Sequence, residues 1–284
     1  MMMNELANLL TAMYKLGIWP EDPKSKEGKA RFKYALKVFR GLLDHEWIKA
    51  SLKRKRKIRI LEMCGGTGIG GVGLAKALQE RGLEVELYVT DLREDALKIA
   101  KSWGTEELNT TVKTFKINAR EVHSLKIRAD IALLYGFSAP HFDPWDMIKV
   151  IASVCESLVD DGVFVIQESD RRWSIFYRAG YKDFLPERID DEKVLVSIHA
   201  GYDFKRGVFK RAMMDLAKKT SPIITDAYFW GLAELMALLW IFFKDVDFMQ
   251  DETGRISGMI IGAYPRRLIS INDLKEMPKI LREQ

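Results

Sequence analysis

The sequence predicts an α/β protein whose core is a mostly parallel β-sheet with helices on both faces. Apolar strand segments alternate with helical segments from about residue 58 to residue 169, and this alternation is typical of parallel sheets. The connections are long enough for right-handed crossovers. Near the C-terminus, two further strands joined by a glycine-containing turn predict an antiparallel hairpin. With this hairpin the predicted sheet has seven strands.

Turn and capping residues mark where the elements begin and end. Gly82 is a good C-terminal cap for one helix, and Pro144 lies in the first turn of another. The turn Asp160-Asp161-Gly162 leads into the fifth strand. The predicted strands are 58–63, 85–90, 111–118, 129–136 and 163–169, and the predicted helices between them are 71–81, 91–103 and 144–158.

Less regular segments flank this alternating core. We expect a short helix over 4–16, helical spacing of apolar residues over 29–52, an apolar helix over 227–243, and hairpin strands over 244–251 and 256–265 around the turn at 252–255. Residues 170–225 mix short strands and loops. The predicted organisation is an N-terminal helical cap (1–54), a main domain (55–265) with an inserted flap (about 170–225), and a C-terminal tail (266–284).

Composition narrows the class of protein. Of 284 residues, 48% are apolar and 30% are charged, and the net charge is +5, so a sizeable core and a mildly basic surface are expected. The two cysteines, Cys64 and Cys155, lie in unlike contexts and predict a reducing, cytoplasmic setting. The N-terminus lacks the features of a secretion signal, and the apolar run 227–243 is too short for a bilayer span. We predict no metal site. Scarce Gln and Asn weakly indicate a thermophilic source.

A glycine-rich turn follows the first strand. Gly66 to Gly71 read G-x-G-x-x-G, the spacing of a dinucleotide-binding loop. However, Glu62 lies at the end of the strand, four residues before Gly66. A carboxylate there repels a pyrophosphate and favours a cation, so we expect an adenosine ligand without phosphate, such as S-adenosylmethionine. The alternative is that Glu62 is a structural carboxylate that accepts hydrogen bonds from nearby backbone N–H groups.

The ends of the next strands carry further polar residues. Asp91 closes the second strand, where its carboxylate can accept hydrogen bonds from both ribose hydroxyls. Asn118 ends the third strand and can bond the adenine amino group, with Ala119 and Arg120 lining the ring. Alternatively, Asp91 is only a helix N-cap and Asn118 only a turn residue. Cys64 is expected to be a small packing residue rather than a nucleophile.

Together, in this order, these motifs resemble class I S-adenosylmethionine-dependent methyltransferases. Glu62, Gly66 and Gly68 match the family's first motif, whereas Cys64 stands where its first glycine is usual. The resemblance covers roughly residues 55–265 and implies a Rossmann-like sheet whose cofactor is S-adenosylmethionine. The implied cofactor-binding residues are Glu62, Cys64, Gly65, Gly66, Thr67, Gly68, Asp91, Leu92, Asn118, Ala119, Arg120, Tyr135 and Gly136, with the last two beside the sulfur.

Catalysis requires little of the protein beyond positioning and exclusion of water, because the sulfonium already activates the methyl group. A general base is needed only for an acceptor that is protonated at the working pH. His141, just past the fourth strand, is the first candidate, and His199 in the flap is the second. A purely structural role is the alternative for both.

The remaining features resemble small-molecule methyltransferases of the ubiquinone-biosynthesis type. The loop after the fourth strand lacks the Asn/Asp-Pro-Pro-Tyr/Phe sequence of DNA-base and glutamine N-methyltransferases, and no Pro-Cys dipeptide indicates a cytosine C5 enzyme. We therefore expect an enclosed acceptor pocket beneath the N-terminal helices and the flap. Its candidate residues, each with an ordinary core role as the alternative, are Tyr14, Trp19, Tyr34, Phe137, Phe142, Trp145, Tyr202 and Trp230.

Two other functions stay open. A tRNA or protein methyltransferase would use the basic run Lys53–Lys57 and the basic residues of the flap to hold its substrate. These flap residues, which would equally suit an acceptor with a carboxylate or phosphate, are Arg171, Arg172, Arg178, Lys205, Arg206 and Arg211. The other possibility is a non-catalytic protein that binds S-adenosylmethionine. The oligomeric state and the methylated atom are not predicted.

Overall fold

A seven-stranded sheet forms the centre of the molecule. The computed structural model describes residues 3–252 and 256–282. The strand order is β10-β11-β5-β4-β1-β2-β3. Its members are β1 (Lys57–Met63), β2 (Glu84–Asp91), β3 (Lys113–Lys116), β4 (Ala129–Leu134), β5 (Leu158–Ser169), β10 (Phe243–Gln250) and β11 (Ser257–Pro265). Strands β1 to β5 pair in parallel, while β11 runs antiparallel to both β5 and β10. This confirms the predicted fold class.

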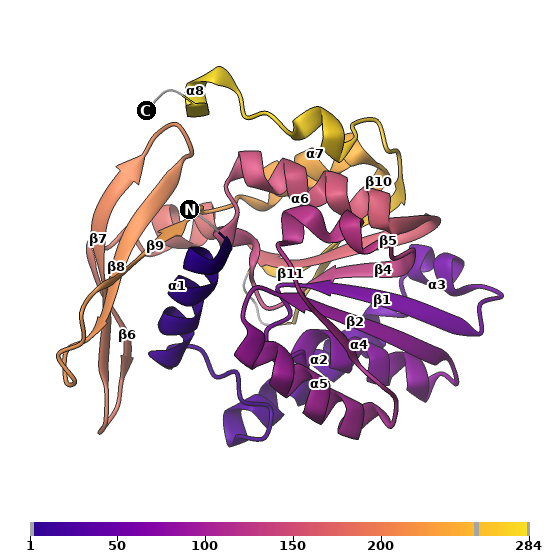
Figure 1. Cartoon of the computed structure of the whole chain (residues 1–284), viewed down its shortest axis with the longest axis horizontal. Coiled ribbons are helices and arrows are strands. Elements are labelled where there is room, and N and C mark those ends of the chain that lie inside the picture. The colour runs from indigo at the N-terminus through magenta and orange to yellow at the C-terminus, as the bar shows by residue number, and fades with distance from the viewer. Residues whose placement is uncertain (1–2, 253–255, 283–284) are drawn as a thin grey trace.

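Helices cover both faces of this sheet (Figure 1). One face carries α2 (Lys26–Leu42), α3 (Glu46–Leu52), α4 (Ile69–Glu80) and α5 (Glu94–Leu108), and the other carries α6 (Pro144–Ser157) and α7 (Leu232–Phe242). Alternate residues of β5 supply the two cores: Val163 and Val165 belong to the cluster beneath α2 and α4, and Phe164 and Ile166 to the one beneath α6 and α7. Period-two alternation along a strand places side chains on both faces.

The N-terminal segment contributes to the core. Ser25 caps α2 by accepting a hydrogen bond from the N–H of Gly28, and Phe39 is fully buried against the sheet. The helical spacing over 29–52 is confirmed in two helices, because the chain breaks after Leu42. His45 then accepts from the N–H of Trp47 and caps α3. After the break the short α3 packs against β5, so the apolar positions at helical spacing are shared between two helices.

The inserted segment forms a separate antiparallel sheet. Its strands are β6 (Phe184–Ile189), β7 (Val194–Asp203), β8 (Val208–Asp215) and β9 (Ile223–Ala227), in that order across the sheet. A short π-helix, Arg172–Arg178, precedes them. Because β9 continues to Ala227, the apolar helix predicted from residue 227 begins only at Leu232. No helix among the described residues is long and apolar enough to cross a membrane.

Two predicted turns have different outcomes. Residues 160–162 lie inside β5 rather than before it: Leu158 pairs with Ala129 and Val163 with Ile131, so the residues between them bulge from the ladder. The hairpin of β10 and β11 is confirmed. Most of its predicted turn, residues 253–255, lies outside the described residues.

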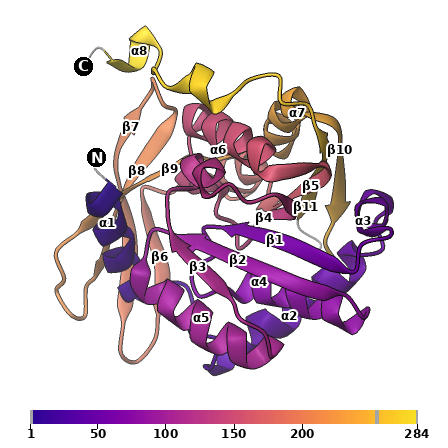
Figure 2. The same ribbon diagram turned by 45° about the vertical axis from the view of Figure 1, so that its right-hand side comes forward.

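Helix α1 (Met3–Lys15) stands apart from the other N-terminal helices. Figure 1 shows it between the insert sheet and the carboxyl ends of the central strands, and Figure 2 shows it beside the insert sheet. The chain ends with the short helices η4 (Ile271–Leu274) and α8 (Lys279–Arg282). In open parallel sheets ligands bind beyond the carboxyl ends of the strands, so α1 lies over the edge where a site is expected.

The buried Phe39 gives a test of the α2 packing. We expect Phe39→Ala to lower the free energy of unfolding by about 3–5 kcal/mol, because it leaves a cavity between α2, α4 and the sheet. The matched control is Trp240→Ala on α7, whose side chain is 59% exposed and whose loss should cost about 1 kcal/mol or less. Urea denaturation of both variants measures the difference; equal losses would contradict the core role of α2.

Candidate cofactor site

A cavity of about 350 Å³ lies at the carboxyl ends of the central strands. Cys64 and the ends of β2 and β3 form its floor, and α1 and β9 lie over it on the opposite side. This volume lies within the range of about 300–1,000 Å³ that is typical of small-molecule and cofactor pockets. The lining residues are Leu6, Leu9, Leu10, Met13, Tyr14, Cys64, Asp91, Leu92, Arg93, Ile117, Asn118, Ala119, Arg120, Ser138, His141, Phe142, Asp146, Arg206, Ile224, Thr225 and Asp226.

The glycine turn has the backbone conformation that its sequence demands. Gly66 and Gly68 both have positive φ, at 53° and 81°, and Gly68 is the N-cap of α4. Cys64 also has a positive φ of 51°, which a residue with a Cβ adopts at a cost. Its side chain lines the cavity, and burial raises the pKa of its thiol. The thiol is therefore protonated, in agreement with a packing role.

Glu62 lies beneath the turn rather than in the cavity. Its side chain is 1% exposed, and Oε1 accepts a hydrogen bond of 2.8 Å from the N–H of Gly71, while Oε2 has no hydrogen-bond partner. A Cβ at Gly65, Gly70 or Gly71 would come within 2.7 Å of this carboxyl group. Burial raises the pKa of Glu62 to about 8. The observed contact is the structural alternative, in which the carboxyl group holds the turn.

Asp91 and Asn118 line the cavity and also hold the local backbone. Asp91 Oδ2 accepts from the N–H of Gly66 and Oδ1 from the N–H of Arg93, both at 2.8 Å. Asn118 Oδ1 accepts from the N–H and Nε of Arg120. Leu92, which follows Asp91 in the chain, and Ala119, which follows Asn118, also line the cavity. Each carboxylate oxygen has a second lone pair, so Asp91 retains acceptor capacity toward a ligand.

The other predicted cofactor residues surround the cavity without lining it. Gly65, Gly66, Thr67 and Gly68 form the turn behind Cys64. Tyr135 packs against Phe39 on the α2 side, with ring centroids 5.2 Å apart. The N–H of Gly136 donates to Oε1 of Gln167 on β5. Their contacts with a cofactor remain predictions.

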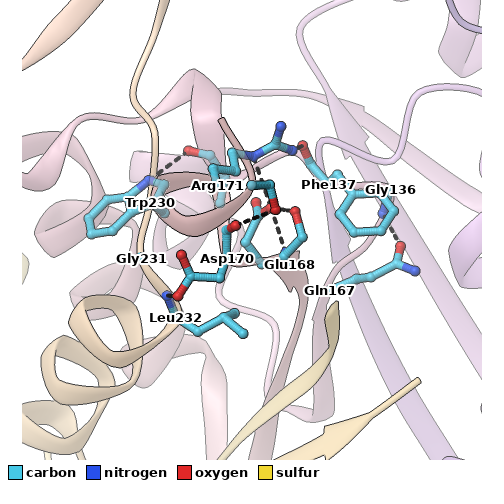
Figure 3. A network of polar contacts seen from close by, with 12 residues as sticks. Gly136, Phe137, Gln167, Glu168, Asp170, Arg171, Trp230, Gly231 and Leu232 are labelled. Atoms are coloured by element: carbon cyan, nitrogen blue, oxygen red, sulfur yellow. Dashed lines mark hydrogen bonds and ion pairs between the residues drawn. The ribbon is translucent and has the colours of Figure 1, made fainter. Parts of the chain in front are cut away.

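The loop after β4 is held in place from two sides (Figure 3). Arg171 donates to Glu168 and to the carbonyl oxygen of Phe137, and its N–H donates to the carbonyl oxygen of Trp230 at 2.9 Å. The indole of Trp230 donates to the carbonyl oxygens of Ala139 and Phe142. These bonds fix the loop that carries His141. Trp230, predicted as a pocket residue, is therefore a fully buried support.

The two candidate bases lie in different places. His141 faces the cavity, where the surrounding protein and then the charges of Arg171 and Arg93 lower its pKa to about 4. It is neutral at pH 7 and can accept a proton or a hydrogen bond. His199 lies on β7 of the insert sheet, its ring bonded to the hydroxyl of Tyr181, and does not line the cavity.

The predicted aromatic residues do not gather in one pocket. Tyr14 and Phe142 line the cofactor cavity, and Trp19 packs on Tyr14. Tyr34 lines a second cavity of about 340 Å³ between α2 and the β10–β11 hairpin. The remaining members are the exposed Phe137, Trp145 with its indole bonded to the carbonyl of Lys205, and Tyr202 packed on Phe209. Helical and strand spacing do not show where such rings point in space.

Several cavity residues carry no clear signal in the sequence. Arg93 follows Asp91 by two positions, yet its side chain is only 3% exposed and forms an ion pair of 2.8 Å with Glu21. Asp146 pairs with both Arg120 and Arg206. These partners come from distant segments, so only the fold brings them together. Among the described residues, no group of three or more His, Cys, Asp and Glu side chains is placed to hold a metal ion.

Most of the predicted basic surface is engaged or distant. The run 53–57 enters the amino end of β1, about 20 Å from its carboxyl end by strand rise, and Lys55 pairs there with Asp130 and Asp161. In the flap, Arg172 pairs with Glu234, Arg206 with Asp143, and the buried Arg211 donates to Ser197. The exposed Arg178 does not line the cavity.

The buried Glu62 predicts how stability depends on pH. An unfolded glutamate titrates near 4.5, so between pH 4.5 and about 8 the folded protein holds a proton that the unfolded chain has released. The free energy of unfolding therefore falls as pH rises through this window. Glu62→Gln removes this dependence, and relative to the native protein it should gain about 2–3 kcal/mol between pH 5 and pH 7.

Urea denaturation of the ligand-free protein at both pH values measures this gain. The exposed Glu121 supplies the matched control, Glu121→Gln, whose difference from the native protein should stay constant. A constant difference for Glu62→Gln as well would show that Glu62 is ionised in the folded protein.

Comparisons with known proteins agree with this geometry. Residues 40–188 match the ubiE/COQ5 methyltransferase family. The PH0226 protein from Pyrococcus horikoshii OT3 has a similar structure, with a TM-score of 0.62, 18% identity, and coverage of 90% of this chain and 99% of that one. An S-adenosylmethionine-dependent methyltransferase from Clostridium acetobutylicum ATCC 824 gives 0.59, 11%, 91% and 98%.

A third similar structure is the sugar N-methyltransferase KedS8 from Streptoalloteichus sp ATCC 53650. Its TM-score is 0.54 at 14% identity, with coverage of 86% of this chain and 90% of that one. No curated protein matches the sequence. At these identities the solved structures establish the fold, whereas the family match covers more than half of the chain. The chain therefore belongs to the ubiE/COQ5 methyltransferase family and is a class I methyltransferase that uses S-adenosylmethionine.

Proposed function

We propose that the enzyme transfers the methyl group to a small molecule, with the cofactor held in the cavity at the carboxyl ends of β1 to β4. The observation that carries this proposal is the lining of the site: α1 and β9 lie over it, and its three arginines, Arg93, Arg120 and Arg206, are each paired with a carboxylate. The neighbour KedS8, a sugar N-methyltransferase, supports a small acceptor on the same fold. An acceptor reaching this site passes beneath the N-terminal helix and the insert.

Individual residues have separate roles in this proposal. Asp91 accepts hydrogen bonds from the ribose hydroxyls, and Asn118 with Ala119 and Arg120 surrounds the adenine. Cys64 and the glycine turn lie against the methionine part, with Tyr135 and Gly136 on its far side. Glu62 supports the turn from below. The cofactor supplies an activated methyl group, so these residues need only orient it and exclude water.

His141 is the group in the cavity that can accept a proton from the acceptor. Its lowered pKa of about 4 keeps it neutral across the physiological range, so it is available as an acceptor but is a weak base. This suits an acceptor that needs hydrogen bonding more than full deprotonation. His199 is paired with Tyr181 in the insert sheet and has no part in this proposal.

A macromolecular acceptor is less well supported. The run 53–57 lies at the opposite end of β1 from the cavity, and Arg206 and Arg211 are engaged in internal contacts. Binding of tRNA depends on phosphate contacts with free cationic side chains. The paired arginines also disfavour an acceptor that is recognised by a carboxylate or phosphate.

The role of Asp91 can be tested by binding. We expect Asp91→Asn to weaken the binding of S-adenosylhomocysteine by about 1–3 kcal/mol, since charge-assisted hydrogen bonds to the ribose are lost. Isothermal titration calorimetry measures the change, and thermal unfolding confirms that the variant folds. The matched control is Asp245→Asn on the exposed part of β10, which should bind normally. Unchanged affinity of the Asp91 variant would remove this residue from the site.

The acceptor class can be tested with labelled cofactor. The enzyme is incubated with S-adenosylmethionine carrying a radioactive methyl group and, in parallel, with small-molecule, RNA and protein fractions of a cell extract. We expect label only in the small-molecule fraction, together with release of S-adenosylhomocysteine. Label in RNA or protein would overturn the proposed acceptor class while leaving the methyltransferase activity intact.

A further inference from the structure

The turn that follows β4 has an uncommon backbone conformation. Gly136 and Phe137 both have positive φ, at 88° and 61°. Glycine adopts this conformation freely, but a residue with a Cβ does so at a cost in free energy. The Phe137 side chain is 38% exposed, so the support for this conformation comes largely from contacts of the backbone. Strained backbone of this kind persists where the surrounding structure holds it, and it clusters at functional sites.

Two side chains from the end of β5 and the segment after it hold this turn. Oε1 of Gln167 accepts a hydrogen bond of 3.0 Å from the N–H of Gly136. Nη2 of Arg171 donates to the carbonyl oxygen of Phe137 at 3.4 Å, and its Nε donates to the buried Glu168 at 3.0 Å. Figure 3 shows the two contacts together. An N–H at one residue of the turn and a carbonyl oxygen at the next are therefore both fixed from the same strand end.

Gln167 is itself firmly placed. Its strand is paired on both sides, with β4 and with β11, where Gln167 lies opposite Met259. Val163 and Val165 face α2 and α4, so the alternation along β5 puts Gln167 on the same face. There its side chain is only 3% exposed and lines the second cavity, between α2 and the β10–β11 hairpin. The amide thus reaches the turn from an interior strand of the sheet.

The turn adjoins the cofactor cavity. Ser138 and His141, which follow it in the chain, line that cavity, and the hydroxyl of Ser138 donates to the carbonyl oxygen of Tyr135 across the turn. In the proposed placement of the cofactor, Tyr135 and Gly136 lie beside the methionine part. A shift of the turn would therefore change how the methyl group meets the acceptor. Group transfer is sensitive to such shifts, since a misplacement of about 1 Å can cost about 10²-fold in rate.

We propose that Gln167 is a positioning residue for methyl transfer, which holds the strained Gly136–Phe137 turn against the methyl-bearing end of the cofactor. Gln167 does not line the cofactor cavity, so it acts through the N–H of Gly136. Arg171 supports the same turn through the carbonyl oxygen of Phe137. This inference rests on the proposed function. It adds that the geometry of transfer is set by the end of β5, from outside the cavity that binds the cofactor.

Two substitutions of Gln167 separate its hydrogen bond from its size. Gln167→Met keeps a similar volume but lacks a strong acceptor, whereas Gln167→Glu keeps an oxygen acceptor in either protonation state. The rate is measured with labelled S-adenosylmethionine and the small-molecule fraction that accepts the label. We expect Gln167→Met to lower kcat about tenfold or more, with KM for S-adenosylmethionine and Kd for S-adenosylhomocysteine within about twofold of the native values. Gln167→Glu should retain kcat within about threefold.

The matched control is Gln79→Met, near the end of α4 that lies away from the glycine turn. The amide of Gln79 donates to the carbonyl oxygen of Leu108 at 3.0 Å, so this variant also loses a hydrogen bond between a side chain and the backbone. It should leave kcat and KM unchanged. Amide hydrogen exchange of Gly136, followed by NMR, should be about fivefold faster in Gln167→Met and unchanged in Gln79→Met. Thermal unfolding confirms that each variant folds.

A native kcat for Gln167→Met would overturn the inference. So would a loss of kcat without faster exchange at Gly136, because Gln167 would then not act through this N–H. An equal loss in Gln167→Glu would show that the acceptor atom is not what matters, and a matching rise in Kd would assign Gln167 to binding instead of transfer. If Gln167→Met does not fold, Gln167→Asn, whose shorter side chain withdraws the amide from Gly136, replaces it with the same expected result. If the native enzyme transfers no methyl group to any fraction, the proposed function fails and this inference fails with it.

Discussion

The architecture of the site depends on the close approach of the glycine turn to the carboxyl group of Glu62. A Cβ at Gly65, Gly70 or Gly71 would clash with this carboxyl group. The hydrogen bond from the N–H of Gly71 joins the end of β1 to the first turn of α4. With this contact in place, Gly66 can donate to Asp91, and the floor of the cavity takes its shape. A buried acid thus acts as a support, at the cost of holding a proton.

The cavity is built from two kinds of surface. The central sheet and the segments that follow its strands supply polar groups that already bond to one another, such as Asp91 with Gly66 and Asp146 of α6 with Arg120. The opposite side, formed by α1 and Ile224 of β9, is largely apolar. Paired polar groups keep their positions before a ligand arrives, which limits the reorganisation that binding requires.

The alternation of strands and helices could be predicted because apolar runs and turn residues are local signals. The prediction of Asp91 and Asn118 in the cavity wall followed from their positions at strand ends. By contrast, the end of β1 indicated that Glu62 matters but not that its side chain turns beneath the loop, since that depends on the packing of α4. The break before α3 also went unseen, because a histidine cap has no strong sequence pattern.

The contacts of Arg93 with Glu21 and Tyr14 could not be predicted from the sequence either, because they join segments more than seventy residues apart. The same holds for the eight aromatic pocket candidates, which share a composition but not a location. Sequence patterns identify the elements that reach a site more readily than the direction of their side chains. Long-range partners depend on how the insert sheet and α1 pack against the central sheet.

The insert leaves and rejoins the central domain at one place, where the N–H of Arg171 meets the carbonyl oxygen of Trp230. A segment whose two ends are neighbours adds little loop-closure entropy as it lengthens. A change in the length of its strands therefore need not move the two ends of the insert, while Arg206 still ties the insert to Asp143 and Asp146 of the central domain. In engineering terms, the insert sheet is a separate module whose backbone joins the central domain along a single seam.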